Sequence, residues 1–326
     1  AGMGTRMNSD LPKVLHKVAA APLLHHALTA ARSLDPARIV VVTGHGAAEV
    51  EAAAKGFDEA CECVLQDPQL GTAHAVSMAA PLLEKMSGDV IVLYGDTPFI
   101  RPETLEAILH ARARHSVVVL GFQARDPGRY GRLISQGESL EKIVEYKDAT
   151  EEERAVTLCN SGVMCASAEL MFDLLTRVEN TNAAGEYYLT DLPQLARAQG
   201  LSAGVVICDE AETLGINTRR ELAAAEAAFQ ARARTDALAA GVTLTAPETV
   251  FFAHDTYVGP DTIIEPNVIF GPEVTIENGA HIRAFSHLEG AHVSRGAVVG
   301  PYARLRPGAE LSENVHVGNF VEIKNA

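Results

Sequence analysis

The sequence predicts an α/β protein of two folded parts: an amino-terminal domain with a mainly parallel sheet, and a carboxy-terminal left-handed parallel β-helix, joined by a long helix. Three observations predict this fold. Helix-like and strand-like segments alternate up to about residue 215, a stretch rich in alanine and charge follows, and beyond Gly241 small apolar residues recur every six positions. We expect the boundaries to lie at 1–217, 218–241 and 242–326. A chain of 326 residues, 47% of them hydrophobic, is long enough to bury the cores of both parts.

The amino-terminal domain is predicted from its apolar runs. Residues 22–34 have helical spacing, whereas 38–46, 88–100 and 115–123 contain the continuous runs RIVVVTGHG, GDVIVLYGDTPFI and HSVVVLGFQ. A continuous run is typical of a strand that is buried on both faces, so we expect an open, Rossmann-like sheet covered by helices. In such sheets ligands bind at the carboxyl ends of the strands, where TGHG and YGD are found here.

The connecting segment and the carboxy-terminal part follow different rules. Residues 218–240 lack glycine and proline and are rich in alanine, which predicts one long helix. A six-residue period, one short strand and one turn, indicates a β-helix rather than an ordinary β-sandwich, whose strands need longer alternating segments. The repeating residues are Val268, Val274, Ala280, Ala291, Ala297, Ala303, Ala309, Val315 and Val321.

Composition excludes several classes of protein. The formal net charge of -15 argues against binding to nucleic acid or to an anionic membrane, since both favour a basic surface. No apolar run reaches the roughly 20 residues of a membrane helix, and the amino terminus does not resemble a signal peptide. Five cysteines without a C-x-x-C pair favour reduced thiols. We therefore expect a cytoplasmic protein.

The first residues, AGMGTRMNSDLPK, form a glycine loop that carries two cations, Arg6 and Lys13. Backbone amides and cations together suit a triphosphate, although a short glycine loop alone is a weak signal. The motifs that follow are QLGTAHA, LYGDTP, YGR, VEYKDA, NSG, GEYYLTD and GIN, and then ARLRPGAEL and HVGNFVEIK in the repeats. In this order they resemble the sugar-nucleotide nucleotidylyltransferases, and over the whole chain the bacterial bifunctional N-acetylglucosamine-1-phosphate uridylyltransferases and glucosamine-1-phosphate acetyltransferases.

The resemblance implies an activity. The enzyme would transfer uridylyl from UTP to N-acetylglucosamine 1-phosphate, releasing pyrophosphate, in the synthesis of peptidoglycan and lipopolysaccharide precursors. Acetyl transfer from acetyl-coenzyme A to glucosamine 1-phosphate would be the second activity. The resemblance also implies a strand before the glycine loop, and coils beyond Ala326 that carry the general base and the coenzyme site, so we expect the acetyl-transfer site to be incomplete in this chain.

Site residues are carried over from the same resemblance. Those implied for the nucleotide are Ala1, Gly2, Arg6, Lys13, Gln66, Gly71 and Thr72. Arg6 and Lys13 would act in catalysis on the phosphates, and Gln66, with Gly71 and Thr72, would read the uracil and the nearby ribose. The amide of Gln66 can donate and accept, which matches the imide edge of uracil. Ala73 stands where the family usually has glycine.

The remaining roles concern a metal and the two sugar phosphates. Asp96 and Asn217 resemble the ligands of Mg²⁺, an ion that favours a few protein oxygens together with substrate phosphates. The residues implied for N-acetylglucosamine 1-phosphate are Gly131, Glu145, Asn160 and Asn217, with Tyr188 and Thr190 nearby. Arg306 and Lys324 would hold the acetyl acceptor, and the β-helix would form a homotrimer.

Other interpretations stay open on the residues alone. Asp96 at a strand end is also a common turn residue, and Glu145 lies in a charged run that suits a solvated helix start. A related glucose-1-phosphate nucleotidylyltransferase, or a sensor of sugar nucleotides without catalysis, would share the glycine loop. Pyrophosphate release from UTP mixed with the sugar phosphate and magnesium distinguishes an enzyme from the sensor.

Overall fold

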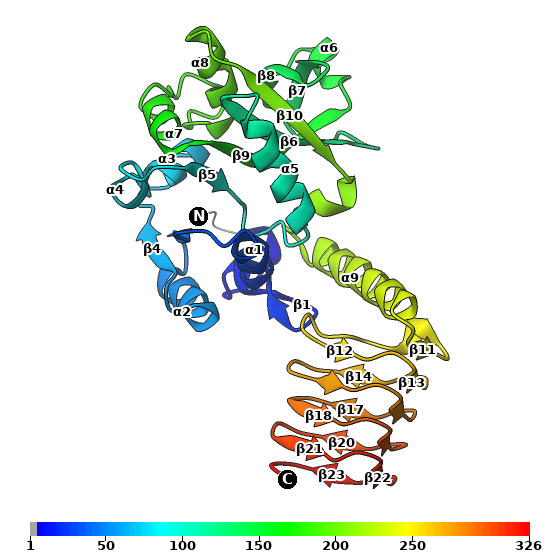
Figure 1. The fold of residues 1–326 in the computed structure, drawn as a ribbon. Coiled ribbons are helices and arrows are strands. Elements are labelled where there is room, and N and C mark those ends of the chain that lie inside the picture. The colour runs from blue at the N-terminus through cyan, green and yellow to red at the C-terminus, as the bar shows by residue number, and fades with distance from the viewer. Residues whose placement is uncertain (1–4) are drawn as a thin grey trace. The chain divides into compact units, whose positions relative to one another are not determined.

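The computed structural model describes residues 5–326, which form two compact units (Figure 1). The first unit comprises the chain up to His16 together with Leu23–Asn217, and the second comprises Lys17–Pro22 and Thr218–Ala326. The helices of the first unit are η1 (Thr5–Met7), η2 (Lys13–Leu15), α1 (Leu23–Arg32), α2 (Ala47–Phe57), α3 (Thr72–Ser77), α4 (Ala80–Leu83), α5 (Pro102–Arg112), α6 (Glu151–Arg154), α7 (Ala168–Leu175), η3 (Leu189–Asp191), α8 (Leu192–Ala198) and η4 (Glu210–Thr213). Its strands are β3 (Val40–Thr43), β4 (Glu62–Leu65), β5 (Asp89–Val92), β6 (Val117–Gln123), β7 (Arg132–Gln136), β8 (Ser139–Val144), β9 (Leu158–Ser167) and β10 (Ala203–Cys208).

The predicted α/β fold is confirmed, but strand directions in the six-stranded sheet are mixed rather than mainly parallel, which the apolar runs do not reveal. In the order β5-β9-β6-β10-β8-β7, the neighbours β6 and β10 are parallel, whereas β9 runs antiparallel to β5 and β6, and β8 runs antiparallel to β10 and β7. Strands β3 and β4 pair in parallel as a separate sheet within the described residues. A buried strand has the same apolar composition in either direction, so the reversal of β9 could not be predicted.

Strand β6 shows why its apolar run is continuous. Val117 and Val119 pack in one cluster with residues of α7 and α8, and Val118 and Leu120 pack in another with residues of α5. Successive side chains of a strand point to opposite faces, so helices on both faces require apolar residues at every position. The strand ends that carry the candidate site are thus held in a sheet buried on both sides.

The second unit contains helix α9 (Arg219–Ala239) and a parallel β-helix. A capping box, in which Thr218 and Glu221 bond reciprocally to each other's backbone N–H, begins α9. The buried Gln230 side chain joins α9 to the first coil, accepting from Phe252 N at 2.9 Å and donating to Phe252 O at 2.7 Å. Both hydrogen-bonding groups of the Phe252 backbone are thereby satisfied inside the unit.

Three parallel sheets make up the β-helix, which appears as stacked short strands in Figure 1. Its strands are β11 (Thr243–Leu244), β12 (Tyr257–Val258), β13 (Ile263–Ile264), β14 (Ile269–Phe270), β15 (Thr275–Ile276), β16 (His281–Ile282), β17 (His287–Leu288), β18 (Ala291–Val293), β19 (Val298–Val299), β20 (Arg304–Leu305), β21 (Ala309–Leu311), β22 (His316–Val317) and β23 (Glu322–Ile323). Of the nine repeating residues predicted, the seven from Val268 to Ala309 are buried in the core and Val315 packs against it, but Val321 in the final coil is 38% exposed.

A short hairpin from the amino-terminal part of the sequence belongs to the second unit. Strands β1 (Lys17–Val18) and β2 (Ala21–Pro22) are joined by Ala19 and Ala20, both with positive φ. Ala19 N donates to Glu226 Oε2 of α9 at 2.7 Å, and Ala19 O accepts from His254 N at 2.9 Å. Alanines, unlike glycine or asparagine, do not mark such a turn, so the sequence predicts these residues within the first domain.

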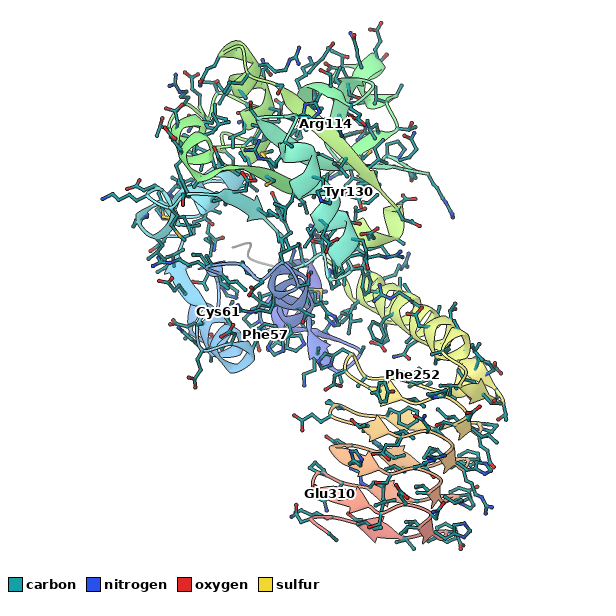
Figure 2. All side chains as sticks on the ribbon, viewed as in Figure 1. Phe57, Cys61, Arg114, Tyr130, Phe252 and Glu310 are labelled. Atoms are coloured by element: carbon teal, nitrogen blue, oxygen red, sulfur yellow. The ribbon has the colours of Figure 1, made fainter. Side chains whose placement is uncertain are left out.

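The cysteines are all free, as expected for reduced thiols. Cys61 packs in a cluster with Phe57, which lies beside it (Figure 2). Burial raises the pKa of the Cys61 thiol, and a buried neutral thiol is a poor nucleophile. Among the described helices, none combines the length and the apolar character needed to cross a bilayer.

Two glutamates connect neighbouring coils of the β-helix. Glu265 accepts from Ala284 N at 2.9 Å and lies 2.8 Å from His281 Nε2. Glu277 makes the equivalent pair of contacts with the next coil, both at 2.9 Å. In each case the backbone hydrogen bond, and then the histidine, lowers the pKa of the carboxyl group.

Because the pKa values of both glutamates are lowered, we expect the β-helix to lose stability in acid. A carboxyl group with a lowered folded-state pKa contributes stability above its unfolded-state pKa, here 4.5, which is lost as the pH falls through the folded-state value. We expect the Tm to fall below that pH, and to fall less steeply in the double variant Glu265→Gln, Glu277→Gln. Thermal unfolding followed by circular dichroism measures this. The exposed Glu310 (Figure 2), changed to Gln, is the control; parallel pH curves for the double variant and the wild type would contradict the prediction.

Candidate active site

The candidate site of the first unit is built around an ammonium group held by oxygens. Lys13 Nζ forms an ion pair with Asp96 Oδ2 and donates to Asn217 Oδ1 at 3.0 Å. Arg6 donates to the same Asn217 oxygen, also at 3.0 Å. The Lys13 and Asp96 side chains are only 15% and 21% exposed, so water screens the pair less than it would on the surface. The structure thus brings together four of the predicted residues from three distant segments.

Local structure fixes the two oxygen donors relative to each other. Asp96 follows strand β5, and its backbone oxygen accepts from Ile216 N at 3.0 Å, next to Asn217. The segment before Asn217 is anchored by the buried Glu212, which accepts from Arg101 N at 3.0 Å and from the Thr104 hydroxyl at 2.7 Å. Glu212 therefore accepts hydrogen bonds from donors at the start of α5, and it also positions the chain that leads to Asn217.

The same arrangement tests whether these residues suit a metal ion. A carboxylate oxygen and an amide oxygen converge on one cationic group, the ammonium of Lys13. Both are hard donors of the kind that binds Mg²⁺, and two protein oxygens are enough when substrate phosphates complete the coordination. Asp96 and Asn217 therefore fit a divalent cation. No cluster of three or more His, Cys, Asp or Glu side chains offers a second metal site in the part of the chain that the structure describes.

The residues predicted for the base form a second group, just after strand β4. Gln66 is 3% exposed, and its Nε2 donates to Gly71 O at 2.9 Å. Gly71 has a φ of +117° and lies against the backbone of Tyr187. A Cβ atom added to Gly71 would lie 2.5 Å from the backbone oxygen of Tyr187. Thr72 Oγ1 accepts from Leu189 N at 2.9 Å. The loop is thus held to a segment more than 100 residues later, and it requires glycine at this position.

The residues predicted for the sugar phosphate also meet. Asn160 N, on β9, donates to Gly131 O at 2.9 Å, and a Cβ on Gly131 would lie 3.4 Å from Glu145 Oε1. Thr190 Oγ1 donates to Glu145 Oε1 at 3.2 Å. Burial raises the pKa of Glu145, and the Thr190 hydrogen bond partly offsets this. Burial, followed by nearby carboxylates, raises the pKa of Tyr188 to about 12, which places Tyr188 close to the same group.

One residue between these groups had no predicted role. The phenol of Tyr94 hydrogen-bonds with Thr72, and its pKa is raised, first by burial and then by the charges of Asp96 and Glu145. Gly162 permits this position, because a Cβ there would lie 2.7 Å from the Tyr94 ring. Tyr94 therefore connects the three groups of site residues. The only signal in the sequence is its place in the LYGDTP motif.

Three predicted regions remain to be placed. Ala1 and Gly2 lie outside the described residues. In the second unit, Arg306 donates to Glu322 Oε1 of the next coil at 2.9 Å. Lys324 is exposed, one residue after β23. Arg306 is thus already neutralised by a carboxylate, which a phosphate would have to displace.

Comparison with known proteins identifies the family. Residues 1–198 match the family model of the MobA-like NTP transferase domain, and residues 255–290 match that of the bacterial transferase hexapeptide (six repeats). A protein of Cereibacter sphaeroides named Bifunctional protein GlmU is 72% identical over 326 residues, which is 100% of this chain and 72% of that protein. The chain belongs to the bifunctional GlmU family. Proteins of the same name from Ruegeria pomeroyi and Paracoccus denitrificans are 64% and 62% identical over the whole chain, which covers 72% and 73% of them.

Membership confirms the family predicted from the motifs, a family of bifunctional uridylyltransferases and acetyltransferases that use a divalent metal and acetyl-coenzyme A. The chain is a nucleotidyltransferase joined to a hexapeptide-repeat β-helix. Solved structures support the fold alone. An apo UDP-glucose pyrophosphorylase has a TM-score of 0.57 at 16% identity, covering 72% of this chain and 96% of that one. An inositol-1-phosphate CTP transferase from T. maritima has a TM-score of 0.55 at 15% identity, covering 68% and 88%.

Proposed function

We propose that the first unit transfers uridylyl from UTP to N-acetylglucosamine 1-phosphate with Mg²⁺, and that the residues of the candidate site have the roles expected from the sequence. The observation that carries the proposal is the convergence of Lys13, Arg6, Asp96 and Asn217. Two cations beside two oxygen donors suit a metal-bound triphosphate.

The reaction needs little proton transfer. A phosphate oxygen of the sugar 1-phosphate, already ionised, attacks the α-phosphorus of UTP in line; the new P–O bond forms as the bond to pyrophosphate breaks. Lys13 and Arg6 donate to the phosphates and stabilise the charge that develops on them. A bound divalent cation would supply Lewis-acid stabilisation of the same phosphate oxygens, held by Asp96 and Asn217. Catalysis then depends on positioning and electrostatics, so a general base is not required.

Gly131, Glu145 and Asn160 bind the sugar phosphate in this proposal, with Thr190 orienting the Glu145 carboxylate. A carboxylate accepts hydrogen bonds from sugar hydroxyls, so the ionised form of Glu145 is the one that binds. Because burial raises the pKa of Glu145, acid conditions should weaken binding of the sugar phosphate at a higher pH than for an ordinary glutamate.

Replacing Thr190 by valine tests this assignment. The variant removes a hydrogen bond that lowers the pKa of Glu145, so this pKa rises further. The pH below which the affinity for the sugar phosphate falls should therefore move upward, and this fall is the acid limb of the pH profile. The KM for the sugar phosphate, measured across pH, reports the shift. Thr176→Val, which removes an exposed hydroxyl beyond α7, is the control. An unshifted limb in Thr190→Val would remove Glu145 from the sugar-phosphate site.

The function itself is tested by pyrophosphate release. UTP and MgCl₂ are mixed with N-acetylglucosamine 1-phosphate or glucose 1-phosphate, and the Cereibacter sphaeroides relative serves as the positive control. We expect release with the acetylated sugar. Faster release with glucose 1-phosphate favours the related glucose-1-phosphate enzyme, and binding of UTP without release with either sugar favours the sensor.

For the second unit we propose the acetyl acceptor site at Arg306 and Lys324, with acetyl-coenzyme A as the donor and a homotrimer formed through the β-helix. The proposal is supported by the match of residues 255–290 to the bacterial transferase hexapeptide family. Light scattering measures the oligomeric state: a mass three times 34.7 kDa is expected. A cytoplasmic location fits the nucleotide and coenzyme substrates.

A further inference from the structure

The side chain of Gln66 makes two contacts through the same nitrogen. Nε2 lies 2.9 Å from Gly71 O and 3.3 Å from Nδ1 of His74, which is on α3. Gln66 is 3% exposed, so its side chain has little freedom to turn or to be solvated. Both side-chain contacts of Gln66 within the described residues are made by Nε2, and neither involves the other amide atom, Oε1.

The Gly71 contact fixes which amide atom is which. A backbone carbonyl can only accept, so the amide atom 2.9 Å from Gly71 O must be the nitrogen. The second hydrogen of that nitrogen points to His74, and Nδ1 of His74 must therefore accept. The His74 ring then carries its proton on Nε2. Both amide hydrogens of Gln66 are used, and Oε1 is the atom left for a ligand.

We propose that His74 is a positioning residue that holds the Gln66 amide in one orientation, so that Gln66 presents only a hydrogen-bond acceptor to the base of the nucleotide. The inference rests on the proposed function, in which Gln66 faces the base. It changes one expectation from the sequence, where the amide was expected to donate and accept. An acceptor alone selects a pyrimidine whose ring nitrogen N3 carries a hydrogen.

Uracil and cytosine differ at that atom. Uracil presents N3–H, which donates to Oε1, whereas N3 of cytosine is an acceptor and would leave two acceptors facing each other. A site built to hydrogen-bond one group rejects an analogue that leaves buried polar atoms unpaired. The amide could serve cytosine only by turning its nitrogen to the base. That turn would place Oε1 against Gly71 O, which can only accept, and it would keep a hydrogen bond to His74 only if the ring proton moved from Nε2 to Nδ1.

Two variants of His74 distinguish a role as hydrogen-bond acceptor for the Gln66 amide from a role in which the His74 ring only fills space. His74→Leu removes the acceptor, and His74→Asn can place an amide oxygen where Nδ1 stands. The affinities of the protein for UTP and CTP, with MgCl₂, are measured by calorimetry. We expect the UTP/CTP affinity ratio to fall about tenfold in His74→Leu, the effect of about one hydrogen bond, and to stay near the wild-type value in His74→Asn. A ratio unchanged in His74→Leu, or lowered equally in both variants, would overturn the proposal.

Two further measurements keep the outcome clear. Gln66→Leu tests the underlying function. If this variant leaves the UTP/CTP affinity ratio unchanged, Gln66 does not bind the base. That result would contradict the role proposed for Gln66 itself and so differs from a failure of the role proposed for His74. Nitrogen-15 spectra of histidine-labelled wild-type protein, assigned by the signal lost in His74→Asn, test the geometry without any nucleotide. A proton on Nε2 is expected, and a proton on Nδ1 would overturn the proposal even if His74→Leu failed to fold.

Discussion

Replacing Asp96 by alanine is expected to lower kcat for pyrophosphate release by about 100- to 1,000-fold, while the KM for the sugar phosphate changes little. Asp96 is the only carboxylate that pairs with Lys13 in the described residues, and its charge faces the point where Lys13 and Asn217 meet. Without Asp96, a bound divalent cation in the proposed function would lose its one anionic protein ligand among the described residues. Binding of the sugar phosphate, proposed to involve Glu145, should be less affected.

The experiment compares turnover with increasing MgCl₂ in the wild type, Asp96→Ala and Asp236→Ala. Asp236 is an exposed aspartate on α9 and serves as the matched control, with wild-type kinetics expected. Thermal unfolding excludes a general loss of folding. Full turnover of Asp96→Ala at saturating magnesium would remove Asp96 from the metal site, and an equal rise in KM for UTP and for the sugar phosphate would indicate a structural role instead.

Much of the fold could be predicted because it rests on short periods in the sequence. The run from Val117 to Phe122 predicts a strand buried on both faces, and residues spaced six apart, such as Val268 and Val274, predict the β-helix core. What escaped prediction depends on contacts between distant residues. The direction of β9 is one case, and the Ala19–Ala20 turn that joins α9 through Glu226 is another, because no residue type marks either.

The candidate site shows the same division. Ordered motifs pointed to Asp96, Asn217 and Lys13, and the structure places these residues in one cluster. Motifs did not reveal that Tyr94 lies between the groups of site residues, or that His74 Nδ1 lies 3.3 Å from the amide nitrogen of Gln66. These roles are set by distances of about 3 Å between side chains, which a pattern of residue types does not encode.

The loop beside Gln66 predicts the second large effect: Gly71→Ala should weaken UTP binding by about 100-fold. The new Cβ would lie 2.5 Å from Tyr187 O and 2.8 Å from Tyr187 N, at a φ of +117°. Both atoms belong to the backbone and are engaged, Tyr187 N donating to Leu70 O at 2.8 Å and Tyr187 O accepting from Ala73 N at 2.9 Å. Relief therefore requires a backbone shift, which costs about 1–3 kcal/mol in strain and about 1 kcal/mol for each broken hydrogen bond.

Gly88→Ala is the matched control, because Gly88 has a similar φ of +114° but open space where its Cβ would lie. It carries the same backbone strain without the clash, so it should lower the Tm while leaving UTP affinity near the wild-type value. Calorimetric titration with UTP and thermal unfolding of both variants give the two quantities. If Gly71→Ala binds UTP as tightly as Gly88→Ala does, the loop yields to the added methyl group, and its contact with Tyr187 does not hold Gln66 in place for the base.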